Sequence, residues 1–192
     1  LDHTADFEES LPRSLVIGAL WELVREGEMP ARDFIDLLLA TLEVETHPTV
    51  IRTILQTTKQ IPSQLLTSAN LYCAPEYRAE TQAKVADALR RMAETAEPGS
   101  DHQLAWARAF AATARTPEQL DLLDALLDGS QTIEGLAVDT ELRWAFVERL
   151  AAVGRFDEAE IAAEYERDKT AAGDRHTAAA RAARPTEEAK AE

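Results

Sequence analysis

The chain has 192 residues, a formal net charge of −15, and 45% hydrophobic residues. A surface with this excess of carboxylates repels the phosphates of nucleic acids and of anionic membranes, so we expect neither as a partner. No hydrophobic run approaches the roughly 20 residues that a membrane span needs, and the N-terminus carries no signal-peptide pattern. The sequence therefore predicts a cytoplasmic protein.

Residues that carry catalytic chemistry are scarce. Cys73 is the only cysteine, which excludes an internal disulfide, and with no histidine nearby we expect a packed thiol. The four histidines are not spaced to bind zinc, and there is no Cys-x-x-Cys pair, Gly-rich phosphate loop or Gly-x-Ser-x-Gly turn. We expect His47 and His102 to serve as cap or turn residues. The sequence predicts no catalytic residue, no metal site and no cofactor in this chain.

The first half of the chain shows helical periodicity. In residues 11–27, Pro12 suits the first turn, Gly27 suits the stop, and we expect Gly18 to permit close approach of a neighbour. The predicted inward residues of this helix are Leu15, Val16, Ala19, Leu20 and Leu23. Those of the helix in residues 30–45 are Phe34, Ile35, Leu38 and Leu42, and those of the helix in residues 49–61 are Val50, Ile51, Ile54 and Leu55.

The next segments have clear boundaries. Residues 63–75 are predicted to be a helix end that runs into a loop, and a long helix follows from Pro75 to about Glu97. The run 98–100, Pro-Gly-Ser, interrupts the pattern before the helix of residues 101–115. Thr116 is the predicted N-cap of the next helix, with Pro117 at its first position, Gln119 completing a capping box, and Gly129 at its end.

The stretch 135–185 contains three predicted helices, each of the first two closed by a glycine. The first covers 139–154, the second runs from Phe156 to near Gly173, and the third begins at Asp174. Helices joined by such short connections pack as antiparallel neighbours.

These patterns predict nine or ten helices and no strand, because runs of alternating hydrophobic residues are absent. We expect an all-α fold: an irregular array of antiparallel helical hairpins that forms an α-superhelix of the HEAT or armadillo kind. No low-complexity linker interrupts the chain, so we expect a single domain over 1–192. The chain starts at Leu1 rather than Met and ends soon after Pro185, which suggests a fragment of a larger protein.

Arg143 and Trp144 form the candidate binding site. Arg143 lies beside the apolar face of its predicted helix, where a guanidinium can anchor a carboxylate such as a peptide C-terminus or an acidic side chain. In the alternative interpretation, Arg143 is a surface residue that pairs with Glu141 or Glu148, and Trp144 packs in the core.

Several segments resemble a known family. They are LPRSLVIGALWELVREGEMPARDFIDLLLATLEVET near the start, TIEGLAVDTELRWAFVERLAAVG, EAEIAAEYERDKTAAGDRH and AARPTEEAK. Together they resemble the C-terminal helical domain of bacterial aminopeptidase N of the actinobacterial type, which is similar to that of the endoplasmic-reticulum aminopeptidases. The most specific pattern is Leu142-Arg143-Trp144 followed by E-x-x-x-D-x-T-x-x-G from Glu164 to Gly173.

The resemblance implies a role in a zinc metallopeptidase that removes N-terminal residues from peptides. In this family the zinc ligands lie in a preceding catalytic domain, and neither HExxH nor Gly-x-Met-Glu-Asn occurs here. The chain would then be a non-catalytic domain that covers the active-site entrance and helps select peptides. Its partners would be the catalytic domain of the same polypeptide and the peptide substrate. The alternative is an independent helical-repeat scaffold that binds partner proteins or peptides.

Overall fold

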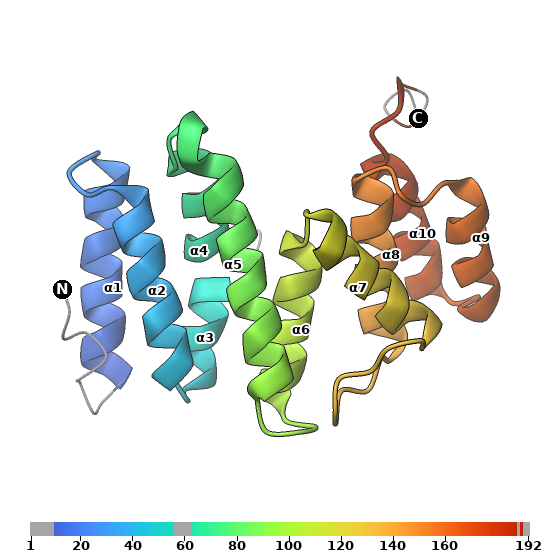
Figure 1. Cartoon of the computed structure of the whole chain (residues 1–192), viewed down its shortest axis with the longest axis horizontal. Helices are drawn as coiled ribbons and strands as arrows, with labels where there is room; N and C mark the ends of the chain where they lie inside the picture. The colour runs from blue at the N-terminus through green and yellow to red at the C-terminus, as the bar shows by residue number, and fades with distance from the viewer. Residues whose placement is uncertain (1–9, 56–62, 188, 190–192) are drawn as a thin grey trace. The chain divides into compact units, whose positions relative to one another are not determined.

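A computed structural model describes residues 10–55, 63–187 and 189. These residues form ten α-helices and one π-helix, and no strand is found among them, which confirms the all-α prediction (Figure 1). They divide into two compact units, one ending at Ala88 and the other starting at Leu89. The boundary lies within a helix, α5. The single domain and the superhelical arrangement stay predictions.

The N-terminal unit contains the first helices and most of α5. Their bounds are α1 Ser10–Arg25, α2 Ala31–Val44, α3 Pro48–Leu55, α4 Gln64–Thr67, the π-helix η2 Ser68–Tyr72, and α5 Pro75–Thr95. The predicted inward residues of α2 and α3 are buried, which confirms those two faces. The part of the third predicted helix beyond Leu55 lies outside the described residues. Cys73 is buried at the end of η2, as predicted.

The C-terminal unit contains the remaining helices. They are α6 Asp101–Thr113, α7 Pro117–Asp128, α8 Thr140–Ala152, α9 Glu158–Arg167 and α10 Ala171–Ala183. Helix α8 lies at the centre, in contact with α6, α7, α9 and α10. The Thr116 capping box, Pro117 at the first turn and the left-handed Gly129 at the end of α7 are all confirmed.

Helix α1 turns a different side inward from the one predicted. Its buried apolar residues are Ile17, Leu20 and Val24, whereas Leu15 is 68% exposed. Of the predicted face, only Leu20 is buried, so that prediction is wrong. The helix carries hydrophobic residues on two sides, and periodicity alone does not decide between them. Gly18 has no close neighbour among the described residues, since a Cβ added there would meet nothing within 4 Å.

A buried ion pair fixes the start of α1 to the connection between α2 and α3. Arg13 donates two hydrogen bonds to the Glu45 carboxylate, 2.9 Å from Nε and 3.0 Å from Nη2. Glu45 also accepts the backbone N–H groups of Thr46 and His47. Burial raises the pKa of Glu45, but the hydrogen bonds from Arg13, His47 and Thr46 outweigh it and hold the pKa below its ordinary value.

We predict that Arg13→Met lowers the free energy of unfolding by about 3 kcal/mol at pH 7, because it leaves the Glu45 carboxylate buried without its counter-charge. The folded-state pKa of Glu45 lies below its unfolded value, so its stabilising contribution is present above the unfolded pKa. This contribution is lost as the pH falls through the folded pKa, and the variant should then approach the parent chain.

Urea unfolding followed by circular dichroism at pH 7 and at pH 3 measures both effects. The matched control is Arg25→Met, which removes the exposed pair of Arg25 with Glu22 and should leave the urea midpoint unchanged. Equal midpoints for the Arg13 variant and the parent chain at pH 7 would contradict the role given to this pair.

Candidate functional site

Helix α8 positions both residues of the predicted binding site. Asp139 is its N-cap and accepts the Leu142 backbone N–H at 2.8 Å, which satisfies one of the free donors of the first turn. Leu142 and Trp144 are fully buried, while the Arg143 side chain contacts α7 and α9.

Arg143 uses its guanidinium to join three helices. Its Nε and Nη2 donate to the two carboxylate oxygens of Glu164 on α9, at 2.6 and 2.7 Å, and its Nη1 donates to the Leu127 carbonyl of α7 at 2.9 Å. Glu164 is 5% exposed, so its carboxylate depends on this bidentate pair. The hydrogen bond to Glu164 raises the pKa of Arg143 although burial lowers it.

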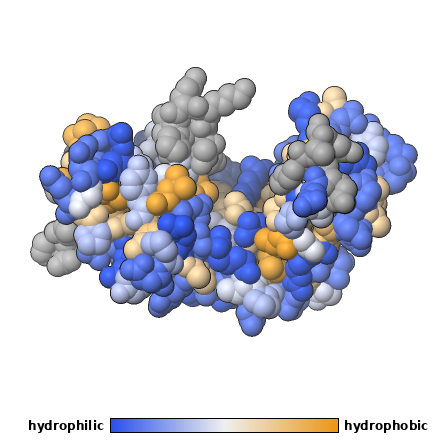
Figure 2. All heavy atoms as spheres, turned by 90° about the horizontal axis from the view of Figure 1, so that it is seen from above, coloured by the Kyte–Doolittle hydropathy of each residue, from blue (hydrophilic) through white to orange (hydrophobic). Residues whose placement is uncertain are grey.

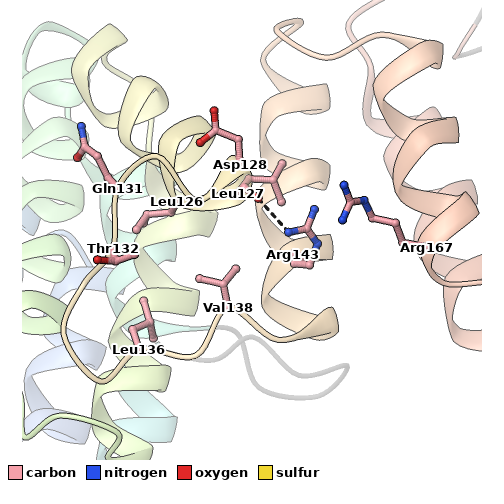
Figure 3. A pocket seen from close by; sticks show the side chains of 10 residues that line it. Leu126, Leu127, Asp128, Gln131, Thr132, Leu136, Val138, Arg143 and Arg167 are labelled. Atoms are coloured by element: carbon pink, nitrogen blue, oxygen red, sulfur yellow. Dashed lines mark hydrogen bonds between the residues drawn. The ribbon is translucent and has the colours of Figure 1, made fainter.

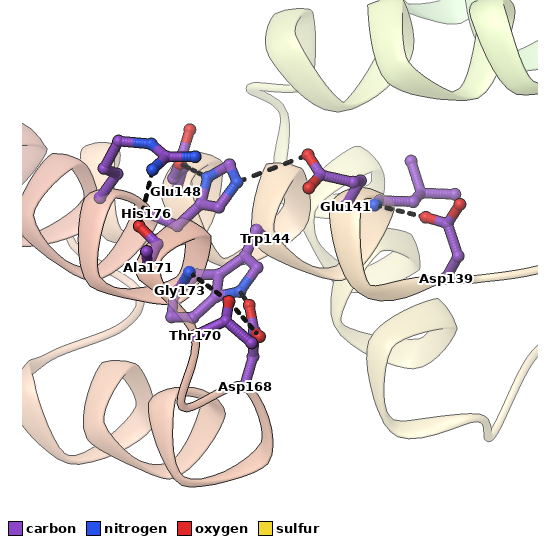
Figure 4. A network of polar contacts seen from close by, with 11 residues as sticks. Asp139, Glu141, Trp144, Glu148, Asp168, Thr170, Ala171, Gly173 and His176 are labelled. Carbon is purple, nitrogen blue, oxygen red and sulfur yellow. Dashed lines mark hydrogen bonds and ion pairs between the residues drawn. The ribbon is translucent and has the colours of Figure 1, made fainter.

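The predicted pairing of Arg143 with Glu141 or Glu148 is wrong. Residues two or five apart do not face each other on a helix, so neither glutamate is placed to meet Arg143. Both instead contact the imidazole of His176 on α10, Glu148 at 2.7 Å and Glu141 at 3.4 Å (Figure 4).

Trp144 lies in the core, as the alternative interpretation predicted. Its side chain is 0% exposed, and its ring stacks on His176 with the centroids 5.5 Å apart. Its Nε1 donates to Asp168 Oδ2 at 2.9 Å, which satisfies the one polar atom of the indole. Asp168 is the residue after α9, so this bond ties α8 to the connection between α9 and α10.

The same connection explains the remaining residues of the sequence pattern. Thr170 donates its hydroxyl proton to Asp168 Oδ1 at 2.8 Å and, as N-cap of α10, accepts the Gly173 N–H at 3.1 Å (Figure 4). A Cβ at Gly173 would lie 1.9 Å from the Asp168 carbonyl oxygen. The predicted helix end at Gly173 is therefore wrong: this glycine lies in the first turn of α10, where the backbone of Asp168 leaves no room for a side chain.

A pocket of about 480 Å³ opens beside Arg143 (Figure 3). Its lining is part apolar and part polar: Leu126, Leu127, Asp128, Gly129, Gln131, Thr132, Leu136, Val138, Arg143 and Arg167. The Arg167 side chain is 70% exposed and lies 3.8 Å from Glu164. The pocket thus has leucine and valine side chains, the Asp128 carboxylate and two guanidinium groups, of which that of Arg143 is paired with Glu164.

The loop of residues 130–139, which forms one wall of the pocket, is held by contacts with α6 and with the turn before it. Gln103 of α6 is buried and donates to the carbonyls of Ala93 and Glu134, while its side-chain oxygen accepts the Gly99 N–H. Gly135 has φ +76° and lies so close to Pro98 that an added Cβ would be 2.4 Å from the Pro98 Cβ. These contacts fix the loop of residues 130–139 to the turn before α6.

Further residues, which the sequence did not single out, lie against Arg143 and Trp144. Glu164, Asp168 and His176 each contact Arg143 or Trp144, and Arg167 lines the same pocket as Arg143. The spacing from Glu164 to Gly173 was the available signal for Glu164 and Asp168, and nothing in the sequence pointed to His176. No group of three or more His, Cys, Asp or Glu side chains in the described part of the chain could hold a metal ion. The described helices also include none long and apolar enough to cross a membrane.

Comparison with known proteins decides the family. The chain matches the ERAP1-like C-terminal domain over residues 1–192. It belongs to this family. The resemblance predicted from the sequence is therefore confirmed.

One relative is aminopeptidase N of Streptomyces lividans, 59% identical over 191 residues. The alignment covers 100% of this chain and 22% of the relative, so the chain spans about a fifth of that protein's length. The ERAP1-like domain is thus one part of a longer peptidase in this relative.

We predict that Gly173→Ala lowers the free energy of unfolding by about 3 kcal/mol, because the Asp168 backbone must move to admit the methyl group. The matched control is Gly18→Ala, the same change in helix α1, where the space beside the glycine is open. That control should stabilise the 192-residue chain by about 0.5–1 kcal/mol, since alanine is the better helix former. Urea unfolding of both variants measures this, and an unchanged stability of Gly173→Ala would contradict the close approach.

Proposed function

We propose that this chain is the C-terminal helical domain of a longer, cytoplasmic zinc metallopeptidase that removes residues from the N-terminus of peptides. The observation that carries the proposal is the 59% identity of the whole chain to 22% of aminopeptidase N from Streptomyces lividans. Zinc would supply the Lewis acid for peptide hydrolysis. By analogy with the family we assign the zinc ion to the catalytic domain of the same polypeptide. The described residues bring together no set of metal ligands.

In this proposal the domain covers the entrance to the active site and helps select peptides. The pocket beside Arg143 supports this role, because its leucine and valine walls suit an apolar side chain and its guanidinium groups suit a carboxylate. Arg143 already binds Glu164 through its Nε and Nη2 atoms. The more exposed Arg167 is therefore better placed to meet a peptide carboxylate.

Contact of Arg143 or Trp144 with peptide stays a prediction. Arg143 lines the pocket and can meet a ligand at its edge. The Trp144 ring is 0% exposed, so we assign it an indirect part: it holds Asp168 and with it the end of α9 that carries Arg167.

The proposal predicts peptidase activity in the longer protein and none in the 192-residue chain alone. The longer protein should hydrolyse an aminoacyl-nitroanilide, lose this activity with a zinc chelator and regain it with zinc. The 192-residue chain should hydrolyse none, with or without zinc. Zinc-dependent turnover by the purified chain, or none by the longer protein, would contradict the proposal. An upstream HExxH-x18-E in the longer protein is the matching sequence test.

Peptide selection predicts that Arg167→Gln in the longer protein raises KM for peptides of about ten residues by about fivefold to tenfold, because one charged hydrogen bond is lost. The kcat should change little, and KM for the nitroanilide should stay the same.

The matched control is Lys169→Gln. It removes the same charge two residues along the chain from Arg167, and the Lys169 side chain does not line the pocket. Steady-state kinetics on both substrates measures the difference. Equal KM values for the Arg167 and Lys169 variants would contradict peptide binding in this pocket.

A further inference from the structure

Helix α1 has two hydrophobic sides, and the described structure covers one of them. Ile17, Leu20 and Val24 are at most 8% exposed, whereas Leu11 and Leu15 are 67% and 68% exposed. At 100° per residue, the exposed and buried sides are centred about 150° apart around the helix. Helix α1 therefore has hydrophobic residues for contacts on two nearly opposite sides.

The exposed side carries a row of hydrophobic residues, with the exposed Glu22 beside them. This stripe follows four-residue steps through Leu11, Leu15, Ala19 and Leu23, all exposed, over three turns of the helix. Single exposed hydrophobic residues are normal on protein surfaces, and Figure 2 shows hydrophobic patches scattered among hydrophilic ones. A row at helical spacing differs from such scatter, because it is the ridge that packs against another helix.

Gly18 adds an independent observation. A glycine inside a helix costs roughly 1 kcal/mol relative to alanine, and within the described residues no neighbour needs the space that it leaves. By helical geometry Gly18 lies at the edge of the stripe, on the side of Leu11 and Leu15, and about 100° around the helix from Ala19. The missing side chain leaves space at this edge, where the backbone of a second helix can approach closely.

We propose that a helix from the preceding part of the longer polypeptide packs on this stripe of Leu11, Leu15, Ala19 and Leu23. The occupant follows from the comparison: the chain corresponds to a C-terminal domain and to 22% of the relative, so most of such a polypeptide precedes α1. This inference rests on the proposed function only in needing the longer polypeptide. It does not need peptidase activity.

Cysteine labelling tests the proposal directly. Leu15→Cys is made both in the 192-residue chain and in the longer protein, and its reaction with N-ethylmaleimide is followed by peptide mass spectrometry. The chain's own Cys73 is buried and serves as an internal reference. The matched control is Leu71→Cys, at a leucine that is 72% exposed and lies on η2.

We expect Leu15→Cys to react at least about tenfold more slowly in the longer protein than in the 192-residue chain, and Leu71→Cys to react at similar rates in both. Equal rates for Leu15→Cys in the two proteins would overturn the proposal. Slow labelling of Leu15→Cys in the 192-residue chain would overturn the proposal too. A rate that is independent of protein concentration would mean that another part of the same chain covers the stripe, and a rate that falls with concentration would mean that a second copy covers it. Loss of peptidase activity would leave all these rates unchanged, which separates the two proposals.

Discussion

The buried carboxylate of Asp168 is the point on which the C-terminal unit depends. One oxygen accepts the Trp144 indole N–H, the other accepts the Thr170 hydroxyl, and the backbone carbonyl lies against Gly173. A buried carboxylate without such donors would cost several kcal/mol, so each partner is constrained in type. Trp144 supplies a buried N–H donor. Thr170 donates to the carboxylate and also caps α10, and only a glycine fits at position 173, beside the Asp168 carbonyl.

This network also explains how a packing motif relates to a surface site. The helix turn that buries Trp144 places Arg143 against Glu164, and Glu164 lies three residues before Arg167 on the wall of the pocket. Because Arg143 is held by both Glu164 and Leu127, that wall is fixed by contacts within the chain itself. The residues of the pattern that includes Trp144 and Asp168 therefore stabilise the wall of the pocket, where Arg167 carries the more exposed guanidinium.

Local signals in the sequence predicted the helices and several of their ends. The capping box at Thr116 and the inward faces of α2 and α3 depend on neighbouring residues, so they could be predicted without a structure. Three features could not. The partner of Arg143 lies 21 residues away, Gly173 reads as a helix stop unless the position of Asp168 is known, and α1 is hydrophobic on two sides. Each depends on which helix packs where.

A double-mutant cycle measures whether Trp144 and Asp168 stabilise the C-terminal unit as a pair. Trp144→Phe, Asp168→Ala and the double variant are unfolded in urea, with Trp106→Phe as a control for the loss of an indole elsewhere in the unit. We expect a coupling energy of about 1–2 kcal/mol between the first two substitutions and none between Trp106→Phe and Asp168→Ala. Additive effects of Trp144→Phe and Asp168→Ala would contradict it.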